Sequence, residues 1–133
     1  MDRNDEKTID DVARQYRRYD VEAYRFMFEA LDYLLGNLGE RRHVSGVELA
    51  AAVRELALER FGFMARTVLN EWNVHSTADL GEIVFHLVTE GLMSKTDDDS
   101  KSDFADLYDF EDALDRGYLW ETPREDPKNG PRN

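Results

Sequence analysis

Apolar residues recur every three or four positions along most of the chain, and polar residues fill the positions between them. This spacing is typical of amphipathic helices, because 3.6 residues make one helical turn. No segment alternates apolar and polar residues over the length of a strand, apart from short stretches at 42–44 and 92–94. The pattern therefore predicts helices over these ranges: 9–18, 21–38, 46–61, 63–72, 77–92 and, shorter, 104–114.

Start and stop signals flank several of these segments. Ser45 and Glu48 form the pattern of a capping box, in which each side chain satisfies the other residue's free backbone N–H. Asp20 stands where an N-cap is expected, and the pair Ser76 and Asp79 suggests another helix start. The expected stop signals are Gly36, Gly39, Gly62 and Asn73.

The fold class that follows is all-α, a single compact domain of five or six helices. Residues 1–8 are predicted to be a flexible leader, 9–120 the helical domain and 121–133 a disordered tail. The segment 21–38 is apolar on most sides, so we expect it to be the central helix. A small two-stranded ribbon is the open alternative, and it would make the fold winged-helix-like.

The charge balance narrows the choice of partners. The formal net charge is −12, with 29 acidic and 17 basic residues, and 12 of the acidic residues lie from Asp97 onward. Such a surface disfavours nucleic acid and anionic membranes, since binding to both depends mainly on Lys and Arg. The chain has no cysteine, which excludes disulfides and thiolate chemistry. We expect a cytoplasmic protein without a secretory signal or membrane span.

The cationic sequence Arg41-Arg42-His43 is the best candidate for contact with an anion or a partner. It precedes the helix start at Ser45, and free N–H groups at a helix start attract anions. The alternative, which we favour, is that Arg41 and Arg42 pair with this chain's own carboxylates between Asp106 and Asp112. Aromatic residues in and just before that stretch would anchor this acidic-aromatic segment, 104–112, on the core: Phe104, Tyr108 and Phe110.

Three further residues are the nearest candidates for metal ligands. Glu82 and His86 are four residues apart, so they share one side of a helix, and His75 lies just upstream. The spacing matches no zinc-site motif. A surface ion pair or a packed histidine explains it better, so we expect no metal and no cofactor.

The chain also lacks the motifs of common enzyme classes. It has no Gly-rich phosphate loop, no Walker motif and no G-x-S-x-G elbow. We therefore expect a protein that is not an enzyme. Residues 55–72 have the layout of a helix-turn-helix with Gly62 in the turn. Arg66 is the one arginine of the second helix, however, and binding in a DNA groove normally needs several cationic contacts.

Several longer strings carry a family resemblance. The strings ALDYLLGNLGERRHVSGVELAAAVRELALERFG, VLNEW, STADLGEIVFHLVTEGLMSKT and DF…YDFEDAL resemble an uncharacterised bacterial family of short, acidic, helical proteins. The resemblance covers about residues 12–115. It implies a bacterial cytoplasmic protein and carries over no functional residue.

Together these features favour a non-enzymatic protein–protein interaction or regulatory module that binds a protein partner or a second copy of itself. The alternative is a winged-helix-like DNA-binding regulator. Catalysis ranks third, and it would require perturbed acids beside a pocket.

If the acidic-aromatic segment folds back on the core, removing every residue after Thr96 will expose apolar surface. We expect the truncated protein to melt at a markedly lower temperature, as measured by circular dichroism. An unchanged melting temperature would show that the segment does not pack on the domain.

Overall fold

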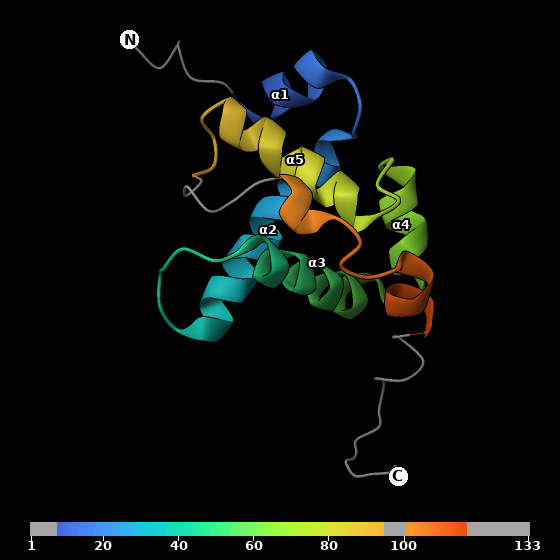
Figure 1. Ribbon diagram of the computed structural model, residues 1–133. Helices are drawn as coiled ribbons and strands as arrows, with labels where there is room; N and C mark the ends of the chain where they lie inside the picture. The colour runs from blue at the N-terminus through green and yellow to red at the C-terminus, as the bar shows by residue number, and fades with distance from the viewer. Residues whose placement is uncertain (1–7, 95–100, 117–133) are drawn as a thin grey trace.

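The computed structural model describes residues 8–94 and 101–116, and these residues form an all-α domain (Figure 1). The predicted fold class is confirmed. The described part of the chain contains no strand, so it provides no support for the two-stranded ribbon. The helices are α1 (Ile9–Tyr16), α2 (Val21–Leu38), α3 (Gly46–Phe61), α4 (Ala65–Glu71) and α5 (Thr77–Thr89).

Most of the predicted helix boundaries are confirmed by their caps. Thr8 and Asp11 form a capping box at α1, and Ser45 and Glu48 form one at α3. Asp20 accepts a hydrogen bond from the Glu22 N–H at the start of α2. Gly39 ends α2 with a φ of 76°, a left-handed conformation that glycine adopts without strain.

Other expected boundary signals differ from the structure in detail. Gly36 lies inside α2, two residues before its last residue, Leu38. Helix α5 begins at Thr77 with Ser76 at its N-cap, as predicted, but the Ser76 side chain makes no cap hydrogen bond. The Asp79 carboxylate accepts from the His75 N–H at 2.8 Å. The helix predicted over 63–72 is divided, because a 3₁₀ turn, Gly62–Met64, precedes α4. Met64, the last residue of that turn, is exposed.

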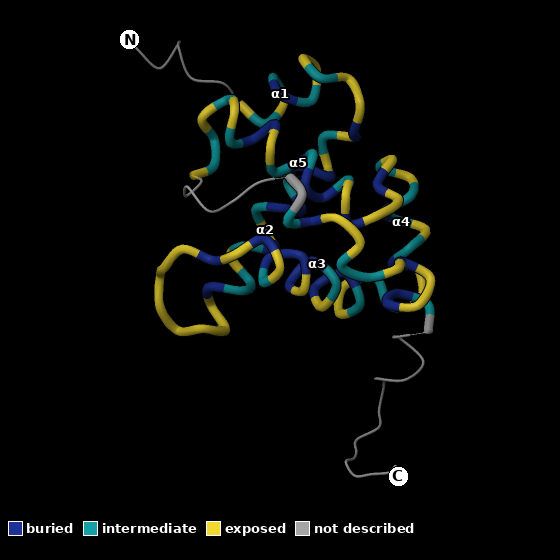
Figure 2. The backbone as a smooth tube through the Cα atoms, in the orientation of Figure 1, coloured by how far each residue is buried: buried dark blue, intermediate teal, exposed yellow. Residues whose placement is uncertain are grey.

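Helix α2 is central only along its first half. Tyr24, Met27 and Ala30 are almost completely buried there, and α2 packs against α1, α3 and α5. Between residues 31 and 38 only Leu35 is buried, and the end of the helix runs beyond the core (Figure 2). The expected central position therefore holds for the first part of α2, whereas Leu31, Tyr33 and Leu34 in its second part are only partly buried.

The acidic-aromatic segment folds back on the domain as expected, although not as one helix. It forms a 3₁₀ turn, Lys101–Phe104, and a π-helical turn, Glu111–Arg116. Asp106 separates them with a φ of 52°, which interrupts any continuous helix. Phe104 and Phe110 are buried, and the Tyr108 hydroxyl donates to the Ala50 carbonyl at 2.7 Å.

Phe104 occupies a space that two glycines leave open. A Cβ added at Gly46 in α3, or at Gly81 in α5, would lie 2.9 Å from a carbon of the Phe104 side chain. Close approach of this kind is one of the structural uses of glycine. The single ring therefore joins the start of α3 to the middle of α5. Residues 117–120, the end of the predicted helical domain, and the predicted tail at 121–133 lie outside the described residues.

Replacement of Phe104 by alanine should destabilise the protein by about 3 kcal/mol, because it removes a buried ring and leaves a cavity between two helices. Denaturant unfolding followed by circular dichroism measures the change. The matched control is Phe85→Ala, since Phe85 is 45% exposed and its loss should cost far less. An equal decrease in the free energy of unfolding for the two variants would show that Phe104 does not join α3 to α5.

Candidate functional site

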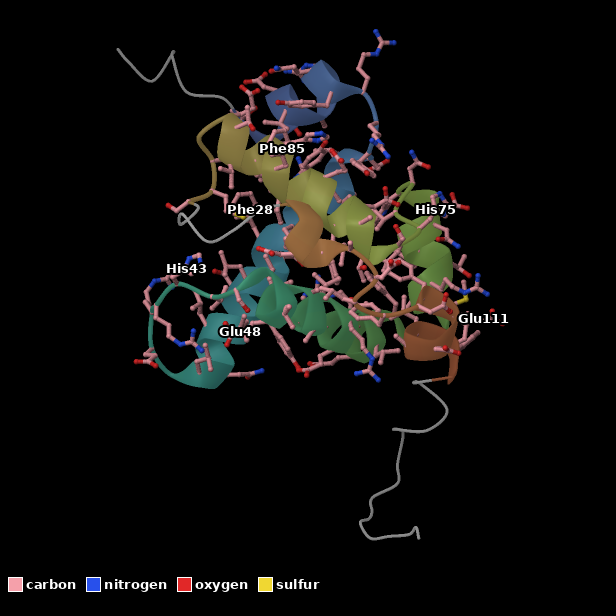
Figure 3. All side chains as sticks on the ribbon, in the orientation of Figure 1. Phe28, His43, Glu48, His75, Phe85 and Glu111 are labelled. Carbon is pink, nitrogen blue, oxygen red and sulfur yellow. The ribbon has the colours of Figure 1, made fainter. Side chains whose placement is uncertain are left out.

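An open apolar groove of about 640 Å³ lies between α2, α5 and the loop that leads into α3. Its size falls within the usual range of ligand-binding clefts. Three of its lining side chains, Phe28, His43 and Phe85, are labelled in Figure 3 and lie in the left half of the view. The lining residues are Phe28, Leu31, Leu35, Arg41, Arg42, His43, Val44, Ser45, Gly46, Leu49, Gly81, Val84, Phe85, Val88, Leu92, Met93, Ser94 and Phe104.

Two helices form the walls, each with one apolar stripe. The stripe of α2 contains Phe28, Leu31 and Leu35, and that of α5 contains Val84, Phe85 and Val88. Both stripes follow the spacing of three and four residues that places side chains on one face of a helix. Such stripes normally pack against another helix, so these walls present an apolar surface that a helix can cover.

The loop at one end of the groove is held by Arg42. Its guanidinium pairs with the Glu48 carboxylate at 2.9 Å and with Glu40 at 3.7 Å, and it also donates to the His43 carbonyl at 2.8 Å. Glu48 also accepts from the Ser45 N–H at 2.8 Å. These hydrogen bonds stabilise the charged carboxylate and lower the pKa of Glu48 to about 2.

The expected pairing of the cationic turn with Asp106 and Asp109 is therefore wrong. Within residues 8–94 and 101–116, the ion-pair partners of Arg42 are Glu48 and Glu40, which lie close to it in the sequence. Asp115 of the C-terminal segment pairs instead with Arg66 of α4 at 2.7 Å. Pairing charges that are close in the sequence costs less loop-closure entropy than pairing distant ones. Arg42 therefore pairs with the nearby Glu40 and Glu48 and not with the distant C-terminal carboxylates.

Arg41 and His43 both line the groove, and both are exposed. No hydrogen bond or ion pair joins Arg41 to another residue of the described part of the chain. Among the described lining residues there is no carboxylate, although the chain has 29 acidic residues. The groove thus combines apolar walls with a cationic end.

The three residues considered as metal ligands do not form one site. His75 contacts Asn70 and Asn73 through its ring nitrogens, at 3.0 Å each, and lies on the other side of the view from His43 (Figure 3). Glu82 and His86 do lie close together, 3.8 Å apart. Within the described residues, no group of three or more His, Cys, Asp or Glu side chains is arranged to hold a metal ion.

His86 instead belongs to the core. Its ring stacks on Tyr16 with centroids 3.8 Å apart, and its Nδ1 shares a 2.9 Å hydrogen bond with the Tyr24 hydroxyl. Burial raises the pKa of Tyr24 to about 12, so that hydroxyl stays protonated at neutral pH. These contacts tie α1 and α2 to α5, which is the structural role expected of a packed histidine.

Helix α4 is the second helix of the helix-turn-helix layout considered for residues 55–72, and two of its polar side chains are engaged within the domain. Helix α4 has only 7 residues, and its Arg66 is paired with Asp115. Asn70 of the same helix shares a hydrogen bond with the His75 ring. This geometry adds no support to the winged-helix alternative.

Comparison with family models, with curated proteins and with solved structures gave no match for this chain. The resemblance to a bacterial family of short helical proteins therefore stays a prediction. No helix among the described residues is both long and apolar enough to cross a membrane.

Sequence reasoning identified the cationic end of the groove and missed its walls. The apolar character of 21–38 predicts a central helix, yet Leu31 is only partly buried, and in α5 Val84 and Val88 are partly buried and Phe85 is exposed. One signal was present, because both segments carry more apolar residues than a single buried stripe requires.

The Glu48 contacts predict a pH effect on stability. Because folding lowers the pKa of Glu48 from 4.5 to about 2, its charge stabilises the folded state above about pH 5, and this contribution is lost as the pH falls toward 2. The variant Glu48→Gln keeps a side chain suited to the capping box but lacks the charge. We expect wild type to melt higher than Glu48→Gln at pH 6, with the difference shrinking by pH 2.5 in calorimetric scans. A difference independent of pH would contradict the assignment.

Proposed function

We propose that this chain is a non-enzymatic, cytoplasmic protein–protein interaction module that binds one helix of a partner in the groove between α2 and α5. The observation that carries the proposal is the pair of apolar stripes that line one groove on two neighbouring helices, with Leu31, Val84 and Val88 only partly buried and Phe85 exposed. The absence of cysteine supports the cytoplasmic location.

The geometry matches a known mode of peptide recognition. In that mode an amphipathic helix lays its apolar face in a hydrophobic groove and anchors it with residues at positions i, i+3, i+4 and i+7. The walls of this groove present the same spacing from the receiving side, through Leu31 and Leu35 of α2 and Val84 and Val88 of α5. A third helix can pack against both walls at once.

Phe85 is the side chain best placed to anchor such a helix. It lies on the groove wall and is 45% exposed, so a partner would bury a large aromatic surface by covering it. Aromatic residues buried at the centre of an interface often carry much of the binding free energy. Because the ring is half-exposed in the described structure, its removal should affect binding more than folding.

The test compares Phe85→Ala with Phe63→Ala. Phe63 is 72% exposed and lies outside the groove lining, so it controls for the loss of an exposed phenylalanine. In pull-downs from the native cell, proteins retained by wild type and by Phe63→Ala should be depleted about tenfold with Phe85→Ala. Equal retention by all three forms would overturn the proposed function.

Analytical ultracentrifugation of the same purified proteins distinguishes the source of the bound helix. If the partner is a second copy, wild type will sediment as a dimer and Phe85→Ala as a monomer. If the partner is another protein, both will sediment as monomers.

A further inference from the structure

We infer that the groove selects an acidic helix, one that places carboxylates beside Arg41 while its apolar face covers the stripes of α2 and α5. This inference rests on the proposed function and adds the chemical class of the partner. In this inference Arg41 binds a carboxylate of the partner helix. Arg42 holds the loop that carries Arg41 in place.

The first argument is the charge of the lining. Acidic residues outnumber basic ones 29 to 17 in the chain, so an average surface of this protein is acidic. The described residues of the groove lining reverse that balance, with Arg41, Arg42 and His43 at one end and no carboxylate. A partner with carboxylates at that end would meet opposite charge there and like charge over much of the remaining surface.

The second argument is the difference between the contacts of Arg41 and those of Arg42. Arg42 is occupied by Glu48, Glu40 and the His43 carbonyl, so its guanidinium is held in place within the loop. Arg41 is exposed at the groove and has no ion pair among the described residues. A guanidinium in this position can bind a carboxylate through two parallel hydrogen bonds.

The loop itself is built as a fixed platform. The capping box of Ser45 and Glu48 sets the start of α3, and Val44, between the cationic turn and that start, is buried. Gly46, the first residue of α3, packs against Phe104. These contacts hold Arg41 next to the apolar walls, and a preorganised contact group loses less entropy when its partner binds.

The experiment uses two designed 18-residue helical peptides, about five turns long, with identical leucine stripes. One carries glutamates beside the stripe and the other carries lysines at the same positions. Their Kd values for the full-length protein are measured by titration calorimetry at about 0.15 M salt, where charges more than about 8 Å apart are largely screened. The variants are Arg41→Glu and, as a control with the same change in net charge, Arg14→Glu on α1, outside the groove lining.

We expect wild type and Arg14→Glu to bind the acidic peptide roughly threefold to tenfold more tightly than the basic one, the scale of one exposed ion pair. Arg41→Glu should reverse that order. If only the net charge of −12 acted, wild type would prefer the basic peptide. Tighter binding of the acidic peptide would therefore indicate a local contact with Arg41.

Equal binding of the two peptides, or tighter binding of the basic peptide by wild type, would overturn the inference. The proposed function would survive that outcome if Phe85→Ala weakened the binding of both peptides. Failure of both peptides to bind wild type would overturn the inference and the proposed function together.

Discussion

The ring of Phe104, seated against Gly46 and Gly81, is the contact on which the arrangement of the groove depends. Helices α3 and α5 can meet this ring closely because neither carries a side chain at the point of contact. The same ring lines the groove, so the C-terminal segment fills the gap between two helices and leaves the surface between α2 and α5 open. The packing that stabilises the domain thereby also shapes the open groove.

The ion pairs show how proximity along the chain decides between possible partners. Net charge indicated that the acidic C-terminal segment would neutralise the cationic turn. Glu48 is only six residues from Arg42, and the capping box already holds its carboxylate at the start of α3. A preorganised neighbour loses little entropy on pairing, so Arg42 is used locally and Arg41 remains at the groove.

The helices were predictable because their signals are local. Asp20, Ser45, Glu48 and Gly39 act on backbone groups within one turn of themselves, and the structure places them as the sequence indicates. The buried stripe of α3, including Leu49 and Val53, follows from helical spacing alone. The split before α4 was not predictable in this way, because a 3₁₀ turn and an α-helix use similar residues.

The amino-acid sequence alone determined the helical class, most helix ends, the buried stripe of α3 and the return of the acidic-aromatic segment to the core. Tertiary structure decided which apolar residues of α2 and α5 are covered, which carboxylate each arginine meets, and that His75 and His86 lie apart. The physical reason is range: caps and periodicity act within a few residues, whereas burial and ion pairing depend on how far-separated segments share a limited surface.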